Sequence, residues 1–345
     1  MADVADAHRL FCVRGCLSGI YPALFLSGFK LIPSLKGQTG NHTGNMVFRQ
    51  SLVVFQFVIT IAMIAGSFII YQQMQYVSKK DLGFNKNQVI TFHINGDMRK
   101  NLPAVRQQLL QNPLIENVAT AGNPIGNNNI GGNDYKVELN GSMDTKSRMA
   151  NQFTIDEDFI PALEIKLAKG RNFSTSMLTD KDKSLIVNET LVKDAGWDEP
   201  IGKKIQFGRD TAGNPIVYEV AGVVKDFNIY SLQHKIEPLI LHLPQQTSEK
   251  DNLYVRISKK NVSAALKYTE AVYKKFDTSN PFEYNFLDQN FARQYESEKT
   301  QGNLLISFTI LAISIACLGL FGLITFTAEQ RRKEIGLCAK YLAAV

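Results

Sequence analysis

Serine nucleophiles, zinc-binding histidine pairs and phosphate-binding loops are the motifs with which many enzyme sites are built. Neither a Gly-x-Ser-x-Gly turn nor a His-Glu-x-x-His helix occurs in the sequence. A phosphate-binding loop needs two glycines with four residues between them, then Lys and Ser or Thr. Gly196 and Gly202-Lys203 come nearest, but one residue too many separates the glycines and Lys204 replaces the hydroxyl. The sequence therefore predicts no catalytic site and no ATP hydrolysis by this chain alone.

Possible metal ligands are dispersed along the chain. Among the histidines, only His234 and His242 are near each other, and surface or strand-edge positions are the better interpretation for them. Cys12 and Cys16 resemble half of a metal site, but no second pair of Cys or His stands at a matching spacing. We therefore expect no metal and no cofactor.

Three neighbouring acids, Asp156-Glu157-Asp158, could suggest a Ca²⁺ loop. The EF-hand spacing and its closing Glu are absent. The acids precede Phe159 in what resembles a short helix, whose positive end favours negative charge. Capping of that helix is the better interpretation.

The charge pattern argues against a nucleic-acid partner. The chain has 345 residues, a formal net charge of +6 and 20% charged residues. Its lysines are scattered and form no basic stripe of the kind that binds phosphate backbones. We expect no nucleic-acid binding.

Two apolar segments must instead dominate the architecture. Residues 51–71 and 304–326 pass without a charged side chain. At 1.5 Å per residue, each helix reaches roughly 30 Å, the thickness of the hydrocarbon core of a bilayer. The sequence therefore predicts two transmembrane helices and a lipid bilayer as a partner.

Small residues within both segments are typical of helix packing in lipid. Ala62-x-x-x-Gly66 lies in the first segment, and the second has Ala312-x-x-x-Ala316 followed by Gly319 and Gly322. Gln56 is the only strongly polar side chain of the first segment. We expect it to form an interhelical hydrogen bond or to lie near the lipid headgroups.

Basic residues on the flanks predict the orientation. Arg331, Arg332 and Lys333 directly follow the second segment, and Lys30 and Arg49 are among the basic residues before the first. Positive residues favour the cytoplasmic side, so residues 72–303 are expected outside the cytoplasm. Residues 15–29 are apolar but short, and we interpret them as the tail of a membrane helix within a partial N-terminal region, 1–50.

Hydrophobic patterning predicts an α+β domain between the segments. Two strand–helix–strand units, one at each end of the domain, are expected to form one subdomain from 72–130 and 245–303, with a strand-rich insert at 131–244. Their predicted strands are 89–94, 115–121, 253–257 and 282–287, and their helices are 102–111 and 262–276. No cysteine lies in this domain, so it folds without disulfides.

Both membrane helices are expected to continue into the domain. Tyr71 to Lys80 keeps helical character until Gly83, a good helix stop. Asp288 can cap a helix that carries Phe291 and runs into Leu304. Such a continuous helix is stiff and would carry movement from one end to the other.

Several segments together carry a resemblance to a known family. The sequence Glu329-Gln330-Arg331-Arg332-Lys333-Glu334-Ile335-Gly336, directly after an apolar helix, resembles the cytoplasmic signature of FtsX-like permeases, the macrolide-exporter (MacB-type) class of ABC transporters. Further segments resemble the extracytoplasmic core domain of that family: 170–173, 187–190, 200–204, 221–227 and 286–288. The resemblance covers nearly all of residues 15–336.

The resemblance implies a bacterial inner-membrane, multi-pass permease subunit without catalytic activity. Its two partners would be an ABC ATPase subunit and a second permease half or a homodimer partner. The cytoplasmic segment 327–345 would contact the ATPase through Arg331, Arg332, Lys333, Glu334, Ile335 and Gly336. The substrate stays open between lipoprotein, lipid, peptide and drug.

The C-terminal region departs from the family pattern. Leu337 to Ala344 replace the expected basic and glycine residues, and two further membrane helices are expected. We therefore interpret the chain as a fragment of a duplicated permease. The alternative is a membrane-anchored extracytoplasmic sensor or receptor, against which the short segment after the second helix argues. A membrane-tethered hydrolase would need a nucleophile and base that the sequence lacks.

Overall fold

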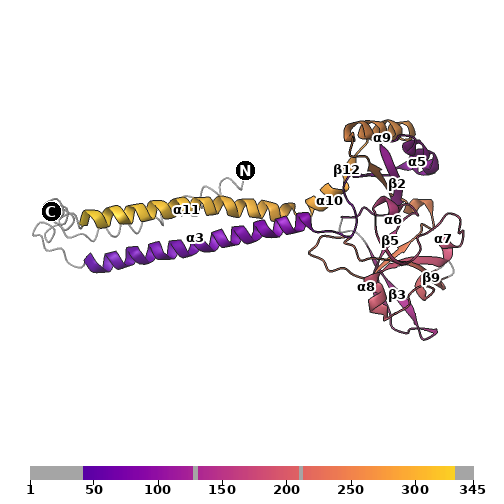
Figure 1. Ribbon diagram of the computed structural model, residues 1–345, viewed down its shortest axis with the longest axis horizontal. Helices are drawn as coiled ribbons and strands as arrows, with labels where there is room; N and C mark the ends of the chain where they lie inside the picture. Colours follow the sequence, from indigo (N-terminus) through magenta and orange to yellow (C-terminus); the bar gives the residue numbers. More distant parts are fainter. Residues whose placement is uncertain (1–41, 127–130, 210–212, 331–345) are drawn as a thin grey trace, which may run out of the picture. The chain divides into compact units, whose positions relative to one another are not determined.

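Two long helices, α3 (His42–Lys79) and α11 (Glu296–Gln330), flank the mixed α+β domain in the chain (Figure 1). The computed structural model describes residues 42–126, 131–209 and 213–330. It divides into two compact units, of which one contains the helices up to Ser67 and from Leu305, and the other spans Phe68–Leu304. Within the described residues, Gln50–Lys79 and Glu296–Glu329 are long and apolar enough to cross a membrane, with mean hydropathy of 2.4 and 2.6 over their most apolar windows.

The first sheet is antiparallel and has the strand order β12-β1-β11-β2. It is built from both ends of the domain: β1 (Val89–His93), β2 (Ile115–Ala121), β11 (Asn252–Ile257) and β12 (Tyr284–Phe286). On one face lie α4 (Gly96–Lys100), α5 (Leu102–Leu110) and α9 (Val262–Phe276), and Figure 1 shows α5 and α9 side by side. Ile90, Phe92 and Val255 point to this face and form a core with the helices. These are the two predicted strand–helix–strand units.

The strand-rich insert forms the second sheet, which closes on itself. Hydrogen bonding runs from β3 through β5, β10, β7, β9 and β8 back to β3, a ring of six strands. Closure removes exposed strand edges from the ring. The strands are β3 (Gly132–Leu139), β5 (Arg148–Thr154), β7 (Ser184–Asn188), β8 (Lys204–Arg209), β9 (Pro215–Val224) and β10 (Leu239–His242). Short β4 (Ser142–Met143) and β6 (Leu167–Gly170) pair with β3 and β9.

Alternation along these strands separates two cores. Leu185 and Val187 belong to the core of the ring, while Ile186 between them belongs to a cluster shared with the first sheet. This follows from the period of two in a strand. The shared cluster also contains Tyr254 of β11 and Phe153 of β5, so the two sheets pack against a common interior. The short helices are α6 (Phe159–Ala162), α7 (Asp180–Lys183), α8 (Glu189–Ala195) and a 3₁₀ turn (Thr247–Glu249).

Two sequence expectations about helix ends are wrong. The predicted single helix from Asp288 to Leu304 is two helices, α10 (Leu287–Arg293) and α11. At the break, the amides of Gln294 and Tyr295 donate to carbonyls three residues back, which tightens the turn. Asp288 lies inside the first turn of α10, where Phe286 holds the N-cap position without a side-chain hydrogen bond.

The acidic run before α6 also differs from the expected helix cap. Asp158 occupies the N-cap position without capping through its side chain. One carboxylate oxygen of Asp156 accepts from the amide of Asp158 before α6 at 3.2 Å, and the other accepts hydrogen bonds from the backbone amide and hydroxyl of Thr120 in β2, at 2.7 and 2.9 Å. Its carboxylate thus satisfies an amide at the edge of the first sheet, and burial raises its pKa to about 6.

Candidate functional site

The six candidate ATPase-coupling residues, Arg331, Arg332, Lys333, Glu334, Ile335 and Gly336, lie outside the described residues, as do residues 15–29. Their role therefore stays a prediction. The segments that carry the family resemblance in the α+β domain are described, and one of them, 221–227, contacts the chain where α3 ends.

Gly83 sets the path of the chain after α3. The helix ends at Lys79, earlier than expected, and Gly83 has a φ of 85°. A Cβ at this position would lie 2.7 Å from the carbonyl oxygen of Asp226 and 2.8 Å from the Cα of Phe227. Only glycine permits this approach, because it alone combines the left-handed conformation with the absence of a side chain. The amide of Asn228 also donates to the carbonyl of Leu82 at 2.8 Å.

Aromatic rings connect the segment that follows α3 to α10, the helix that precedes α11. Phe84 packs edge-on against Phe227, with ring centroids 6.2 Å apart, and against Phe291 of α10 at 5.6 Å. All three rings are nearly inaccessible to solvent and belong to the shared core cluster. Edge-to-face aromatic contacts of this kind stabilise a fold beyond the area that they bury. The chain leaving α3, the strand-end segment 224–227 and α10 therefore form one packed joint.

Asp226 links this joint to α8. Its carboxylate accepts hydrogen bonds from the amide and hydroxyl of Thr190, at 2.9 and 2.8 Å, and its amide donates to Glu189. The neighbouring Asn188 caps α8 by accepting from the amide of Leu191 at 3.0 Å. Two segments that were identified by resemblance, 187–190 and 221–227, are thus bonded to each other.

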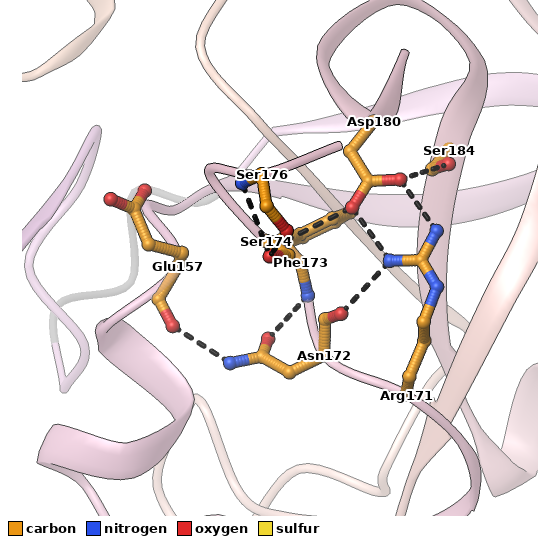
Figure 2. Close-up of polar contacts among 8 residues, drawn as sticks. All are labelled: Glu157, Arg171, Asn172, Phe173, Ser174, Ser176, Asp180 and Ser184. Atoms are coloured by element: carbon orange, nitrogen blue, oxygen red, sulfur yellow. Dashed lines mark hydrogen bonds and ion pairs between the residues drawn. The ribbon is translucent and has the colours of Figure 1, made fainter. Parts of the chain in front are cut away.

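An ion pair with a buried carboxylate fixes the segment after β6 (Figure 2). Arg171 donates two parallel hydrogen bonds of 2.6 Å to the carboxylate of Asp180, whose side chain is completely buried. The amide of Ser174 and the hydroxyl of Ser184 donate to the same carboxylate at 3.0 and 2.9 Å. The hydrogen bonds from Arg171 hold the pKa of Asp180 below its usual range, and those to Asp180 raise the pKa of Arg171. Asn172 donates to the carbonyl of Glu157 at 2.7 Å, which extends this network toward α6.

The glycines of the resemblance segments have a packing role. A Cβ at Gly222 would lie 2.2 Å from the carbonyl oxygen of Arg171, and one at Gly170 would lie 2.4 Å from that of Ala221. Strands β6 and β9 therefore approach each other here more closely than side chains permit. This is a structural explanation for both glycines.

The site offers rigidity rather than reactive groups. The carboxylates of Asp180 and Asp226 are each occupied by hydrogen bonds from the protein. No group of three or more His, Cys, Asp or Glu side chains that could hold a metal ion occurs in the described part of the chain. What this arrangement can do is join the helix-flanking segments firmly to the sheets.

The apolar segments contact each other through polar and small residues. The hydroxyls of Ser67 and Thr309 are 2.9 Å apart. Gly66 faces Leu305, and Gly319 faces the amide of Gln56. The Gln56 amide nitrogen is buried but has no hydrogen-bond partner within the described residues, so this atom does not form the interhelical hydrogen bond that was one of the two expectations for Gln56. The small-residue expectation is confirmed for Gly66, while Ala62 is exposed.

Together, the fold and the site define an α+β domain that is flanked in the chain by two helices long and apolar enough to cross a membrane. Residues 52–271 match the profile of the family described as MacB-like periplasmic core domain, and the chain belongs to this family of ABC transporter permeases. The resemblance inferred from the sequence is thereby confirmed.

Three solved structures are similar to part of this chain. The periplasmic region of MacB from Actinobacillus actinomycetemcomitans is 17% identical (TM-score 0.41), over 64% of this chain and 97% of that one. A domain of a permease protein from Porphyromonas gingivalis is 15% identical (TM-score 0.41), over 58% and 90%. The extracellular domain of the ABC-type transporter YknZ from Gram-positive bacteria is 13% identical (TM-score 0.39), over 57% and 97%. No curated protein sequence matches the chain.

Sequence reasoning located the segments but missed the contacts among them. Asp180 was not singled out, although an acid nine residues after Arg171 in a polar segment is a usable signal. Arg256 was missed as well. It is buried in β11, where its guanidinium donates to the carbonyl oxygens of Ala162, Asn85 and Asn87, and burial lowers its pKa. A charged residue within an apolar strand is the signal that could have identified it.

Proposed function

We propose that this chain is a non-catalytic permease subunit that transmits ATPase-driven movement to its extracytoplasmic domain for export or release of a substrate. It would reside in the bacterial plasma membrane as a multi-pass protein. The spans would be 51–71 and 304–326. Residues 1–50 would contain the end of a preceding membrane helix and a cytoplasmic loop, and 327–345 would lie in the cytoplasm.

One observation carries this proposal: the segments flanking both helices pack into the same buried cluster. Leu82 and Phe84 follow α3, Leu287 and Phe291 precede α11, and all four belong to the same buried cluster as Phe227. Protein interiors are close-packed and transmit strain. A displacement of either helix end would therefore act on one joint, and Asp226 and Thr190 would pass it to the closed ring of strands.

The energy would come from an ABC ATPase that contacts Arg331, Arg332, Lys333, Glu334, Ile335 and Gly336. A short charged segment attached to a membrane helix suits a groove on a soluble partner. A second permease half or a homodimer partner would complete the transporter.

We expect the substitution Glu334→Lys to abolish co-purification with the ATPase, while Lys340→Glu, a matched charge reversal nearby, leaves it intact. Equal retention of the ATPase by both variants would refute the coupling assignment.

The orientation can be tested separately. Leu178 is 88% exposed in a loop of the extracytoplasmic domain. In a background with all native cysteines replaced by serine, Leu178→Cys is expected to react with a membrane-impermeant maleimide in intact spheroplasts. Thr327→Cys, at the predicted cytoplasmic end of the second span, is expected to react only after lysis. The reverse pattern would overturn the proposed topology.

A further inference from the structure

A cleft of about 520 Å³ opens on the first sheet, beside the α10 helix of the joint described above. We call it the amide cleft, because four of its eleven lining residues carry carboxamide side chains. It is lined by Thr91, Phe92, His93, Pro124, Gly126, Asn252, Glu283, Asn285, Asn290, Arg293 and Gln294. Its volume falls within the roughly 300–1,000 Å³ of small-molecule sites.

The cleft lies where one sheet face changes from apolar to polar. Thr91 of β1 is paired with Tyr254 of β11 and with Asn285 of β12, and His93 is paired with Asn252. Directly paired residues point to the same face. Tyr254 is buried in the shared core, whereas the other four positions are polar and line the cleft. A sheet face built only for stability would continue its apolar pattern.

Hydrogen bonds among the lining residues organise the wall in advance. Arg293 donates to the side-chain carbonyl oxygens of Asn285, at 2.8 Å, and Asn290. Asn290 in turn donates to the Thr91 hydroxyl at 3.5 Å, and only 9% of Asn290 is exposed. Pre-organised polar groups lose little entropy when a ligand binds.

Gln294 points to a missing partner. Its side-chain oxygen and nitrogen are both buried, yet neither has a hydrogen bond within the described residues. Buried polar atoms are nearly always paired, because an unpaired one loses its interaction with water without compensation. Gln294 lines the cleft, and once its side chain turns toward the cleft a ligand there can supply both an acceptor and a donor.

The wall specifies the chemistry of the ligand. Asn252, Asn285, Asn290 and Gln294 each carry a donor and an acceptor on one planar group. Arg293 and Glu283 carry opposite charges, so the lining of the cleft favours neither an anionic nor a cationic ligand. Hydroxyl groups also donate and accept at one atom, and neighbouring hydroxyls on a sugar ring match a carboxamide pair.

We propose that the amide cleft binds a neutral carbohydrate of about disaccharide size. A peptide fits less well, because its side chains need apolar subsites, and the described wall offers mainly the buried Phe92 and Pro124. This site goes beyond the proposed coupling function and does not depend on it.

Saturation-transfer NMR on the full chain in lipid nanodiscs, free of sugar detergents, tests the proposal. The probes are maltose, cellobiose and N,N′-diacetylchitobiose, with trialanine as the peptide comparison. At least one disaccharide is expected to bind saturably. Asn290→Leu and Gln294→Met should each weaken its binding by about tenfold or more, as expected when a hydrogen bond to a ligand is lost.

Gln88→Met is the matched control, because Gln88 also has a buried, unpaired amide oxygen but does not line the cleft. It should leave sugar binding unchanged. Gln294→Met should also raise the melting temperature of the ligand-free protein by roughly 2–4 °C, since it removes unpaired atoms. The proposal is overturned if no disaccharide binds at about 20 mM, if only trialanine binds, or if Gln294→Met binds sugar as the wild type does.

Discussion

The ion pair between Arg171 and Asp180 predicts a large loss of stability when its charge is removed. In Asp180→Asn the side chain keeps its shape but loses its charge. One of its two oxygens becomes an amide nitrogen, which faces donors from Arg171, Ser174 or Ser184. A buried position that accepts four hydrogen bonds is thus given a donor where an acceptor is required.

The magnitude follows from the burial of the two partners. Removing one member of a buried pair costs about 3–5 kcal/mol when the remaining charge is also buried. Here the Arg171 side chain is 41% exposed, while that of Asp180 is 1% exposed. The guanidinium can therefore regain water, which lowers the expected loss to about 2–3 kcal/mol.

Thermal unfolding of the full chain in nanodiscs measures this loss. For a domain of this size, 1 kcal/mol corresponds to about 2–4 °C, so Asp180→Asn should lower the melting temperature by about 4–12 °C. The control is Glu199→Gln, which breaks the exposed pair with Lys169 at 3.3 Å and should cost less than about 1 kcal/mol. If both variants shift the melting temperature equally, burial of the Asp180 carboxylate is not the source of its stabilisation.

Two further variants test the edge of the first sheet and the joint. The pKa of Asp156 is about 6, above its unfolded value, so its contribution to stability is greatest below about pH 4 and is lost as pH rises to 6. Across that window the free energy of unfolding of the wild type should fall by about 2–3 kcal/mol, and Asp156→Asn should not show this fall. Urea unfolding at several pH values measures both proteins, and an equal pH dependence of their stabilities would contradict the prediction. Gly83→Ala should destabilise by more than about 2 kcal/mol, because its Cβ meets the backbone of Asp226 and Phe227. Gly141→Ala, with a φ of 81° and open space around it, should cost only about 1 kcal/mol, and equal losses would show that packing at Gly83 is unimportant.

Regular alternation and helical spacing made the first sheet predictable. The strand expected at 115–121 and the helix expected at 262–276 coincide with β2 and α9. In α9, Ala265 and Val272 recur at helical spacing and are both buried. These elements bury one face each, so their local pattern and their tertiary environment agree.

Elements whose environment is set by distant segments were not predictable. Strand β6 is exposed at all four residues, and its position is fixed by close backbone approach to β9. Strand β10 is short and pairs with β5 and β7, so no local alternation indicates it. Closure of the ring and the ion pair of Asp180 depend on such long-range pairing, which composition and periodicity do not contain.

The attachment of the insert has a consequence for the order of folding. The chain leaves the first sheet after Ala121 and returns at Asn252, and these two residues are directly paired. Bringing them together through an unstructured loop of about 130 residues would cost about 4 kcal/mol in chain entropy. Once the ring of strands has formed, only the short segments that join it to β2 and β11 remain unstructured, so the loop that must be closed is much shorter. The insert is therefore expected to fold first and to nucleate the pairing of β2 with β11, although it comes from the middle of the chain.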